Sequence, residues 1–171
     1  MIELFPHQDD FLYSDAIHTG LVAGFGAGKS YVGILKAIRK KMQYPDINVA
    51  YYLPTYPLIK DIAFVGFEKL LTEHNIPYTL HQTDKDIITP YGKIILRSMD
   101  NPSLIIGYEV GYSIIDEADI LGTDKMQEVF IKALARNRVK LPDGKPNSFD
   151  FVSTPEGFKF LYNFFVKKAS D

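Results

Sequence analysis

Apolar residues recur along this chain in two patterns, short continuous runs and longer amphipathic stretches. The short runs are typical of buried strands, and apolar residues spaced three or four apart are typical of helices that cover a sheet. The segments expected to be strands are 20–22, 48–54, 78–80, 86–89, 93–96, 112–116 and 149–153. The segments expected to be helices are 31–42, 57–74, 123–136 and 158–168. Strands that alternate with helices indicate an α/β fold with a mostly parallel sheet and right-handed crossovers.

One stretch departs from this alternation. Pro90-Tyr91-Gly92 joins the apolar runs 86–89 and 93–96. Proline at the second and glycine at the fourth position suit a type I turn, so we expect an antiparallel hairpin at one edge of the sheet.

The segment Ala23–Ser30 has the order strand, glycine loop, helix that a phosphate-binding loop requires. Glycines let backbone N–H groups approach a phosphate, and the following helix presents its free amides to the same anion. Lys29 is expected to reach the β- and γ-phosphates of ATP, and the Ser30 hydroxyl to ligate Mg²⁺. The remaining loop residues expected to contact ATP are Gly24, Phe25, Gly26, Ala27 and Gly28.

Ala23 departs from the pattern G-x-x-x-x-G-K-[ST], which has glycine at this position. A methyl group is tolerable there if the residue keeps a negative φ.

The apolar strand at 112–116 ends in two carboxylates, Asp116 and Glu117. Asp116 is placed to hold the Mg²⁺ whose other protein ligand is Ser30. Glu117 is placed to orient the water that attacks the γ-phosphate. An Asp-Glu pair alone is a common feature, but its occurrence downstream of the glycine loop predicts Mg²⁺-dependent ATP hydrolysis.

Two further polar residues are expected near this site, each with a second interpretation. Thr154, after the strand at 149–153, can sense the γ-phosphate and couple its presence to the following segment, or it can cap a helix before Pro155. Gln8 can read the adenine edge, or it can cap a short helix.

Arg136 and Arg138 follow the helix after Glu117. One of them can serve as an arginine finger, in cis or on a neighbouring subunit. The alternative is that basic residues here complement the dipole of the helix end.

Composition narrows the class of protein. The 171 residues suit a single domain with a sizeable core, and the absence of cysteine excludes disulfides and thiolate metal sites. No apolar run approaches membrane-spanning length and the first residues lack a basic signal region, so we expect an intracellular protein without membrane association. The net charge of −2 neither supports nor excludes a DNA partner.

Taken together, these motifs resemble the ATPase domain of a tailed-phage terminase large subunit. The resemblance spans nearly the whole chain. The segments that carry it are 5–8 (FPHQ), 23–30, 100–109 (DNPSLIIGYE), 114–117 (IIDE) and 153–157 (STPEG). The DNP…G…E stretch and the STPEG ending discriminate the family, because glycine-loop motifs alone would not.

The resemblance implies a P-loop NTPase fold of the RecA-like (ASCE) type, with residues 1–171 forming one ATPase domain. It implies a motor that hydrolyses ATP to drive double-stranded DNA into a procapsid, working in the cytoplasm of an infected bacterium. It also implies a portal protein, a small terminase subunit and further copies of the chain in a ring as partners. By position, Gln8 would contact adenine and Thr154 would be the coupling residue. Full-length relatives continue into an RNase H-like nuclease domain, so the chain looks like an isolated ATPase fragment.

The loop departs from the family at a second position. Many members carry an arginine that acts on the γ-phosphate where this chain has Phe25. The finger is therefore expected elsewhere, at Arg136 or Arg138 across a subunit interface.

Two other functions remain open. A superfamily 2 helicase motor is suggested by Asp116-Glu117-Ala118-Asp119, which spells the DEAD motif, but Ser153-Thr154-Pro155 differs from the usual Ser-Ala-Thr. Such helicases also need a second RecA-like domain. A nucleotide-binding switch with little turnover is the third possibility, and the presence of Lys29 and Glu117 weighs against it.

Overall fold

A seven-stranded sheet forms the centre of the computed structural model, which describes residues 4–167. The strand order is β1-β7-β6-β2-β5-β4-β3. The strands are β1 (His18–Val22), β2 (Val49–Leu53), β3 (Thr79–His81), β4 (Asp86–Thr89), β5 (Gly92–Ser98), β6 (Tyr112–Asp116) and β7 (Ser148–Ser153). The five strands β1, β7, β6, β2 and β5 are parallel, and β4 and β3 complete one edge in antiparallel pairing. The α/β class, the mostly parallel sheet and the antiparallel edge are confirmed.

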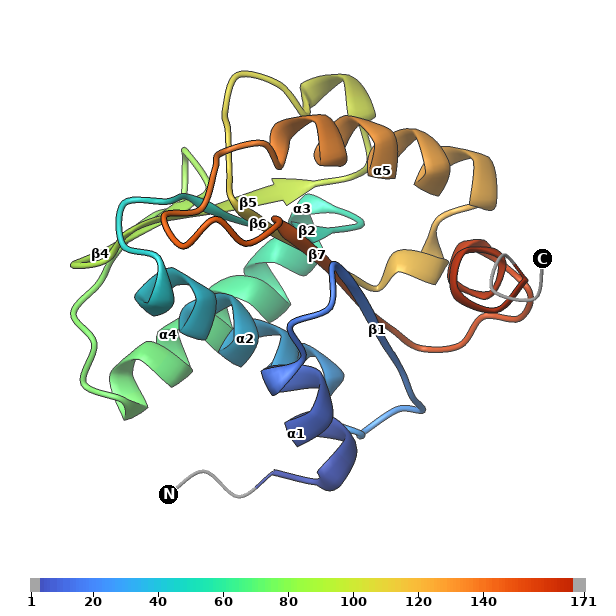
Figure 1. Ribbon diagram of the computed structural model, residues 1–171, viewed down its shortest axis with the longest axis horizontal. Helices are drawn as coiled ribbons and strands as arrows, with labels where there is room; N and C mark the ends of the chain where they lie inside the picture. The colour runs from blue at the N-terminus through green and yellow to red at the C-terminus, as the bar shows by residue number, and fades with distance from the viewer. Residues whose placement is uncertain (1–3, 168–171) are drawn as a thin grey trace.

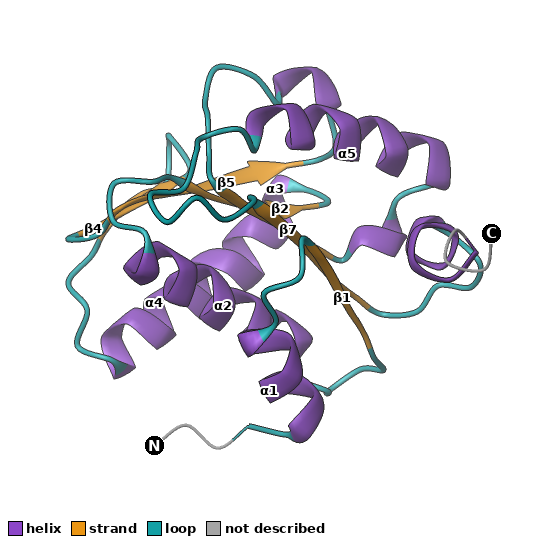
Figure 2. Ribbon diagram, in the orientation of Figure 1, coloured by secondary structure: helices purple, strands orange, loops and turns teal. Residues whose placement is uncertain are grey.

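Helices cover both faces of the sheet (Figure 1). On one face lie α1 (Pro6–Tyr13), α2 (Lys29–Gln43) and the continuous helical stretch α3 (Tyr56–Leu58), η1 (Ile59–Phe64) and α4 (Val65–Glu73). On the other lie α5 (Thr123–Arg136), the short helix η4 (Tyr162–Val166) and the connection that contains η2 (Pro102–Leu104). A further short turn, η3 (Ala118–Ile120), follows β6. Figure 2 shows the resulting order of layers, helix, sheet, helix.

The helix expected over 57–74 contains a π-helical segment, η1, and the expected last helix begins at residue 160 instead of 158. It comprises residues 160–167, and position 168 lies outside the described residues. Within residues 4–167, every helix is too short or too polar to cross a membrane.

A buried ion pair joins the first helix after the glycine loop to the sheet. Lys36 Nζ on α2 lies 2.6 Å from Asp150 Oδ2 on β7, and both side chains are fully buried. Asp150 also accepts hydrogen bonds from the Tyr112 hydroxyl and the Thr19 amide. Because a buried charge is costly unless it is paired, this network fixes how α2 sits on β1, β6 and β7.

Candidate active site

The glycine loop, the acidic strand end and the Thr154 segment meet at the carboxyl ends of the parallel strands. β7 lies between β1 and β6, and the carboxyl ends of all three strands point the same way. The Ala23 amide donates to the Ser153 carbonyl at 3.2 Å, and the Glu117 amide donates to the Val152 carbonyl at 2.8 Å. Three segments far apart in the sequence are therefore neighbours where crevices form in parallel sheets.

The glycine loop curls so that α2 begins at Lys29. Gly26 and Gly28 have φ values of 76° and 70°, a region that L side chains rarely adopt. Ala23 is not among the residues with positive φ, so its methyl group is compatible with the loop. The Lys29 amine donates to the Gly24 carbonyl at 2.9 Å, so it lies folded over the loop. The arrangement leaves the first amides of α2 directed at the loop, as anion binding requires.

Phe25 occupies the tip of the loop and is 91% exposed. Its ring lies 5.9 Å from Lys29 Nζ. An aromatic side chain cannot neutralise charge on a phosphate, so the loop itself supplies no arginine.

Gln8 lies against the glycine loop, and its amide is engaged by the protein. Its Nε2 donates to the Ala27 carbonyl at 3.0 Å, and its Oε1 accepts from the Phe5 amide at 3.1 Å. Gln8 therefore caps α1 and holds the loop at once. Its contact with adenine stays a prediction.

Asp116 ends β6 in a fully buried position with its two oxygens in different environments. Oδ2 accepts a hydrogen bond from the Tyr51 hydroxyl at 2.6 Å, while Oδ1 has no hydrogen-bond partner among residues 4–167. Burial raises the pKa of Asp116 to about 6, although the Tyr51 hydrogen bond and the nearby Ser30 hydroxyl act in the opposite direction. An unpartnered carboxylate oxygen beside a serine hydroxyl fits Mg²⁺, which prefers hard oxygen ligands. Ser30 and Asp116 are the residues that would hold it.

Glu117 turns the chain at the end of β6 in a left-handed conformation, with φ 56° and ψ 45°. Its Oε2 accepts a hydrogen bond from the Thr154 amide at 3.3 Å. The Thr154 hydroxyl oxygen is buried and has no hydrogen-bond partner within the described chain. The Glu117 carboxylate and the Thr154 backbone are thus brought together at the end of β7, the strand that pairs with the glycine-loop strand.

Asp119 is a structural member of the site that sequence reasoning assigned no role. Its side chain is buried and Oδ1 accepts from the Leu161 amide at 3.1 Å, while its own amide donates to Ser153 Oγ. Lys159 Nζ donates to the Asp119 carbonyl at 2.9 Å. Asp119 therefore fixes the segment after Thr154 to the turn after Glu117.

Arg136 and Arg138 lie at the other end of the parallel strands, where β6 begins. The Arg136 carbonyl accepts from the amide of Val110, which precedes β6, whereas Asp116 ends that strand. Arg138 Nε donates to Glu109 at 3.0 Å. The 14 residues of α5 span about 21 Å, so neither arginine reaches Asp116 at the carboxyl end of β6 in its own chain. The prediction of a cis finger at these positions is not supported, and a role in trans stays a prediction.

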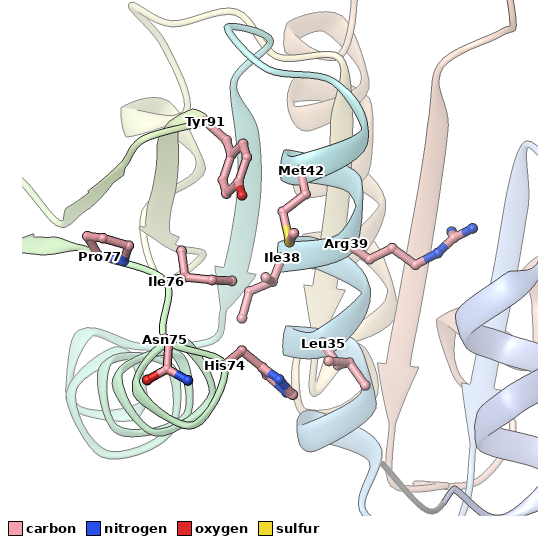
Figure 3. Close-up of a pocket in the computed structure, with 9 residues that line it drawn as sticks. All are labelled: Leu35, Ile38, Arg39, Met42, His74, Asn75, Ile76, Pro77 and Tyr91. Atoms are coloured by element: carbon pink, nitrogen blue, oxygen red, sulfur yellow. The ribbon is translucent and has the colours of Figure 1, made fainter. Parts of the chain in front are cut away.

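A cavity of about 490 Å³ lies at the far end of α2 (Figure 3), remote from the glycine loop. Its apolar wall includes Leu35, Ile38 and Met42 of α2 and Ile76 before β3. Figure 3 shows Arg39 pointing away from the other lining residues, toward α1, where its guanidinium lies 4.9 Å from the Tyr13 ring. This cavity is therefore not the predicted nucleotide site.

Solved structures share this architecture. The large terminase of a thermophilic bacteriophage matches with a TM-score of 0.83 at 16% identity, over 99% of this chain and 44% of that one. The large terminase ATPase domain of Thermus phage P74-26 matches with a TM-score of 0.72 at 19% identity, over 95% and 69%. This chain has the fold of a large-terminase ATPase domain. The N-terminal domain of the bacteriophage phi29 DNA packaging ATPase matches with a TM-score of 0.66 at 13% identity, over 95% and 85%.

The terminase ATPase fold confirms the P-loop NTPase architecture. The first of these three proteins, the large terminase matched at 16% identity, has also been solved with ADP and with ATP-γ-S. The present chain spans less than half of that large terminase. No protein-family model and no curated protein matches the sequence.

Proposed function

We propose that this chain is the ATPase of a DNA-packaging motor, which hydrolyses ATP with Mg²⁺ and uses the energy to translocate double-stranded DNA into a procapsid. The observation that carries the proposal is that two unpartnered buried oxygens, Asp116 Oδ1 and Thr154 Oγ1, lie at the same end of the parallel strands as the glycine loop with Lys29. A buried polar atom without a partner calls for an explanation, and a ligand bound beside the glycine loop would supply partners for both oxygens.

Each residue has a role in the proposed hydrolysis. Loop amides and Lys29 bind the β- and γ-phosphates, and Mg²⁺ supplies charge neutralisation when bound between Ser30 and Asp116. Glu117 orients a water molecule and accepts its proton as that water attacks the γ-phosphate. The Thr154 amide donates to Glu117, so the state of the carboxylate is passed to β7 and the segment that follows.

The assembly is proposed on the likeness to packaging ATPases. Several copies form a ring around double-stranded DNA and bind a portal protein and a small terminase subunit in the host cytoplasm. Arg136 or Arg138 then acts on the site of a neighbouring copy. The nuclease domain of full-length terminases is proposed to lie outside these 171 residues.

The test is ATP hydrolysis by the purified chain with Mg²⁺ and with EDTA, with and without double-stranded DNA. The proposal predicts hydrolysis that requires Mg²⁺ and rises with duplex DNA. A triplex-displacement assay then separates the motor from a helicase, because a duplex translocase displaces a third strand and leaves the duplex intact. ATP-dependent separation of the duplex strands would favour the helicase, and Mg²⁺-independent or absent hydrolysis would contradict the proposal.

A further inference from the structure

Tyr51 lies next to the metal-binding end of β6 although it belongs to another strand. It stands in the middle of β2, where its register partner on β6 is Ile114. Because side chains alternate along a strand, Asp116, two residues beyond Ile114, faces the same side of the sheet. The Tyr51 hydroxyl crosses that distance and donates to Asp116 Oδ2 at 2.6 Å.

The Tyr51 side chain is held by packing at its ring and at its hydroxyl. It meets the Phe67 ring of α4 edge to face, with centroids 5.4 Å apart and an interplanar angle of 84°. Its hydroxyl lies 3.4 Å from the point where a Cβ would stand on Gly33 of α2. Tyr51 is fully buried, so its hydroxyl has no water to exchange with and stays on the carboxylate.

We infer that Tyr51 is a positioning residue for the metal site, and that its hydroxyl fixes the Asp116 carboxylate so that Oδ1 faces the cation. A carboxylate with one oxygen bound by a rigid donor cannot rotate freely, and its second oxygen then keeps one direction. Outer-shell hydrogen bonds of this kind orient the ligands of many metal sites. This inference rests on the proposed function, because it concerns the Mg²⁺ that ATP hydrolysis would use.

The chain offers a matched control on the neighbouring strand. Tyr112 is also buried, and its hydroxyl donates to Asp150 Oδ2 at 2.8 Å. Asp150 belongs to the ion pair with Lys36 and is not a predicted metal ligand. Tyr51→Phe and Tyr112→Phe therefore each remove one buried hydroxyl donor from one buried aspartate, and only the first acts next to the nucleotide.

The experiment measures binding of a fluorescent ATP analogue over a range of Mg²⁺ concentrations, and binding in EDTA. It also measures the Tm of each nucleotide-free variant. Tyr51→Phe is expected to raise the Mg²⁺ concentration for half-maximal binding about tenfold or more, the usual effect of losing an outer-shell partner. Binding in EDTA is expected to change less than twofold, and Tyr112→Phe to leave the Mg²⁺ requirement within twofold of wild type.

A lowered Tm in both variants with an unchanged Mg²⁺ requirement would overturn the inference, because Tyr51 would then be structural only. If Tyr51→Phe fails to fold, Phe67→Leu keeps the hydroxyl but loosens the ring, and its Mg²⁺ requirement is expected to rise in the same direction. No rise in that variant would also overturn the inference. Wild-type protein that binds the analogue equally well in Mg²⁺ and EDTA would instead overturn the proposed function, and the role of Tyr51 with it.

Discussion

The Thr154 amide donates a hydrogen bond to the Glu117 carboxylate, with 3.3 Å between N and Oε2. This contact joins the ends of β6 and β7, and β7 in turn pairs with the glycine-loop strand β1. Glu117 is held there in a left-handed conformation, which costs a residue with a Cβ about 1–2 kcal/mol. Strain of this kind at a strand end is often part of a functional site.

Loss of the Thr154 hydroxyl is expected to slow turnover. Thr154→Val keeps the shape of the side chain and the amide that binds Glu117, but it removes the unpartnered Oγ1. A hydrogen bond to a charged group is worth about 1.5–3 kcal/mol, so kcat is expected to fall about 10- to 100-fold while ATP binding changes little. Thr89→Val in the remote β4–β5 hairpin is the control, since its hydroxyl donates to the Gly92 carbonyl. Equal effects of both variants on kcat would contradict the role of Thr154.

The two glycines Gly24 and Gly28 are expected to differ in their tolerance of a side chain. Gly28 has φ 70°, and a Cβ there would collide with the Gln8 amide. The backbone penalty alone is about 1–2 kcal/mol, so Gly28→Ala is expected to weaken ATP binding tenfold or more and to lower Tm. Gly24→Ala is the control for the effect on Tm, because its Cβ would meet no protein atom within 4 Å. Thermal unfolding of the two variants and equilibrium ATP binding by Gly28→Ala check this. A similar loss of Tm in both variants would contradict the observed loop conformation.

Lys41 is expected to make the stability of the protein depend on alkaline pH. The Lys41 amine donates to the Ile47 carbonyl at 2.7 Å. Burial lowers the pKa of this amine to about 8. The unfolded chain keeps this proton to about pH 10.4, so between these values it binds more protons than the folded chain. The contribution of Lys41 to the free energy of unfolding therefore rises with pH across that window.

Urea unfolding of wild type and Lys41→Met at pH 7.5 and at pH 10 tests this. The stability of Lys41→Met relative to wild type is expected to fall as the pH rises. Lys125→Met, which removes an exposed lysine, controls for the loss of one positive charge. A relative stability of Lys41→Met that does not fall between the two pH values would contradict the prediction.

The arginine finger is tested by mixing variants. Arg136→Ala and Arg138→Ala each keep Glu117, and Glu117→Gln keeps both arginines. If the finger acts in trans, an inactive arginine variant mixed with Glu117→Gln is expected to regain part of the ATPase rate, because mixed interfaces combine an intact Glu117 with an intact arginine. Arg138 is bound to Glu109, so its use requires that pair to open. Absence of rescue at every mixing ratio would exclude both residues as trans fingers.

The parts of the site that follow strand ends could be predicted from the sequence. Asp116, Glu117 and Thr154 each end or follow a strand, and parallel strands carry their carboxyl ends to one edge. Tyr51 could not be assigned, because its partner depends on the register between β2 and β6, which no local pattern determines.

Asp119 was missed because its role depends on η3 and on the distant Leu161 amide. The position of Arg136 and Arg138 could have been anticipated. A helix that returns from the end of one parallel strand to the start of the next ends near the amino ends of the strands, away from the site.

The most direct test of ATP hydrolysis at this site compares Glu117→Gln with wild type in one experiment that measures both ATP binding and steady-state phosphate release. Glutamine keeps the size of the side chain but cannot accept a proton from water. The proposed role predicts wild-type affinity for ATP with phosphate release reduced about 100-fold or more, whereas Lys29→Ala is expected to lose affinity itself. Phosphate release by Glu117→Gln at the wild-type rate would contradict the account.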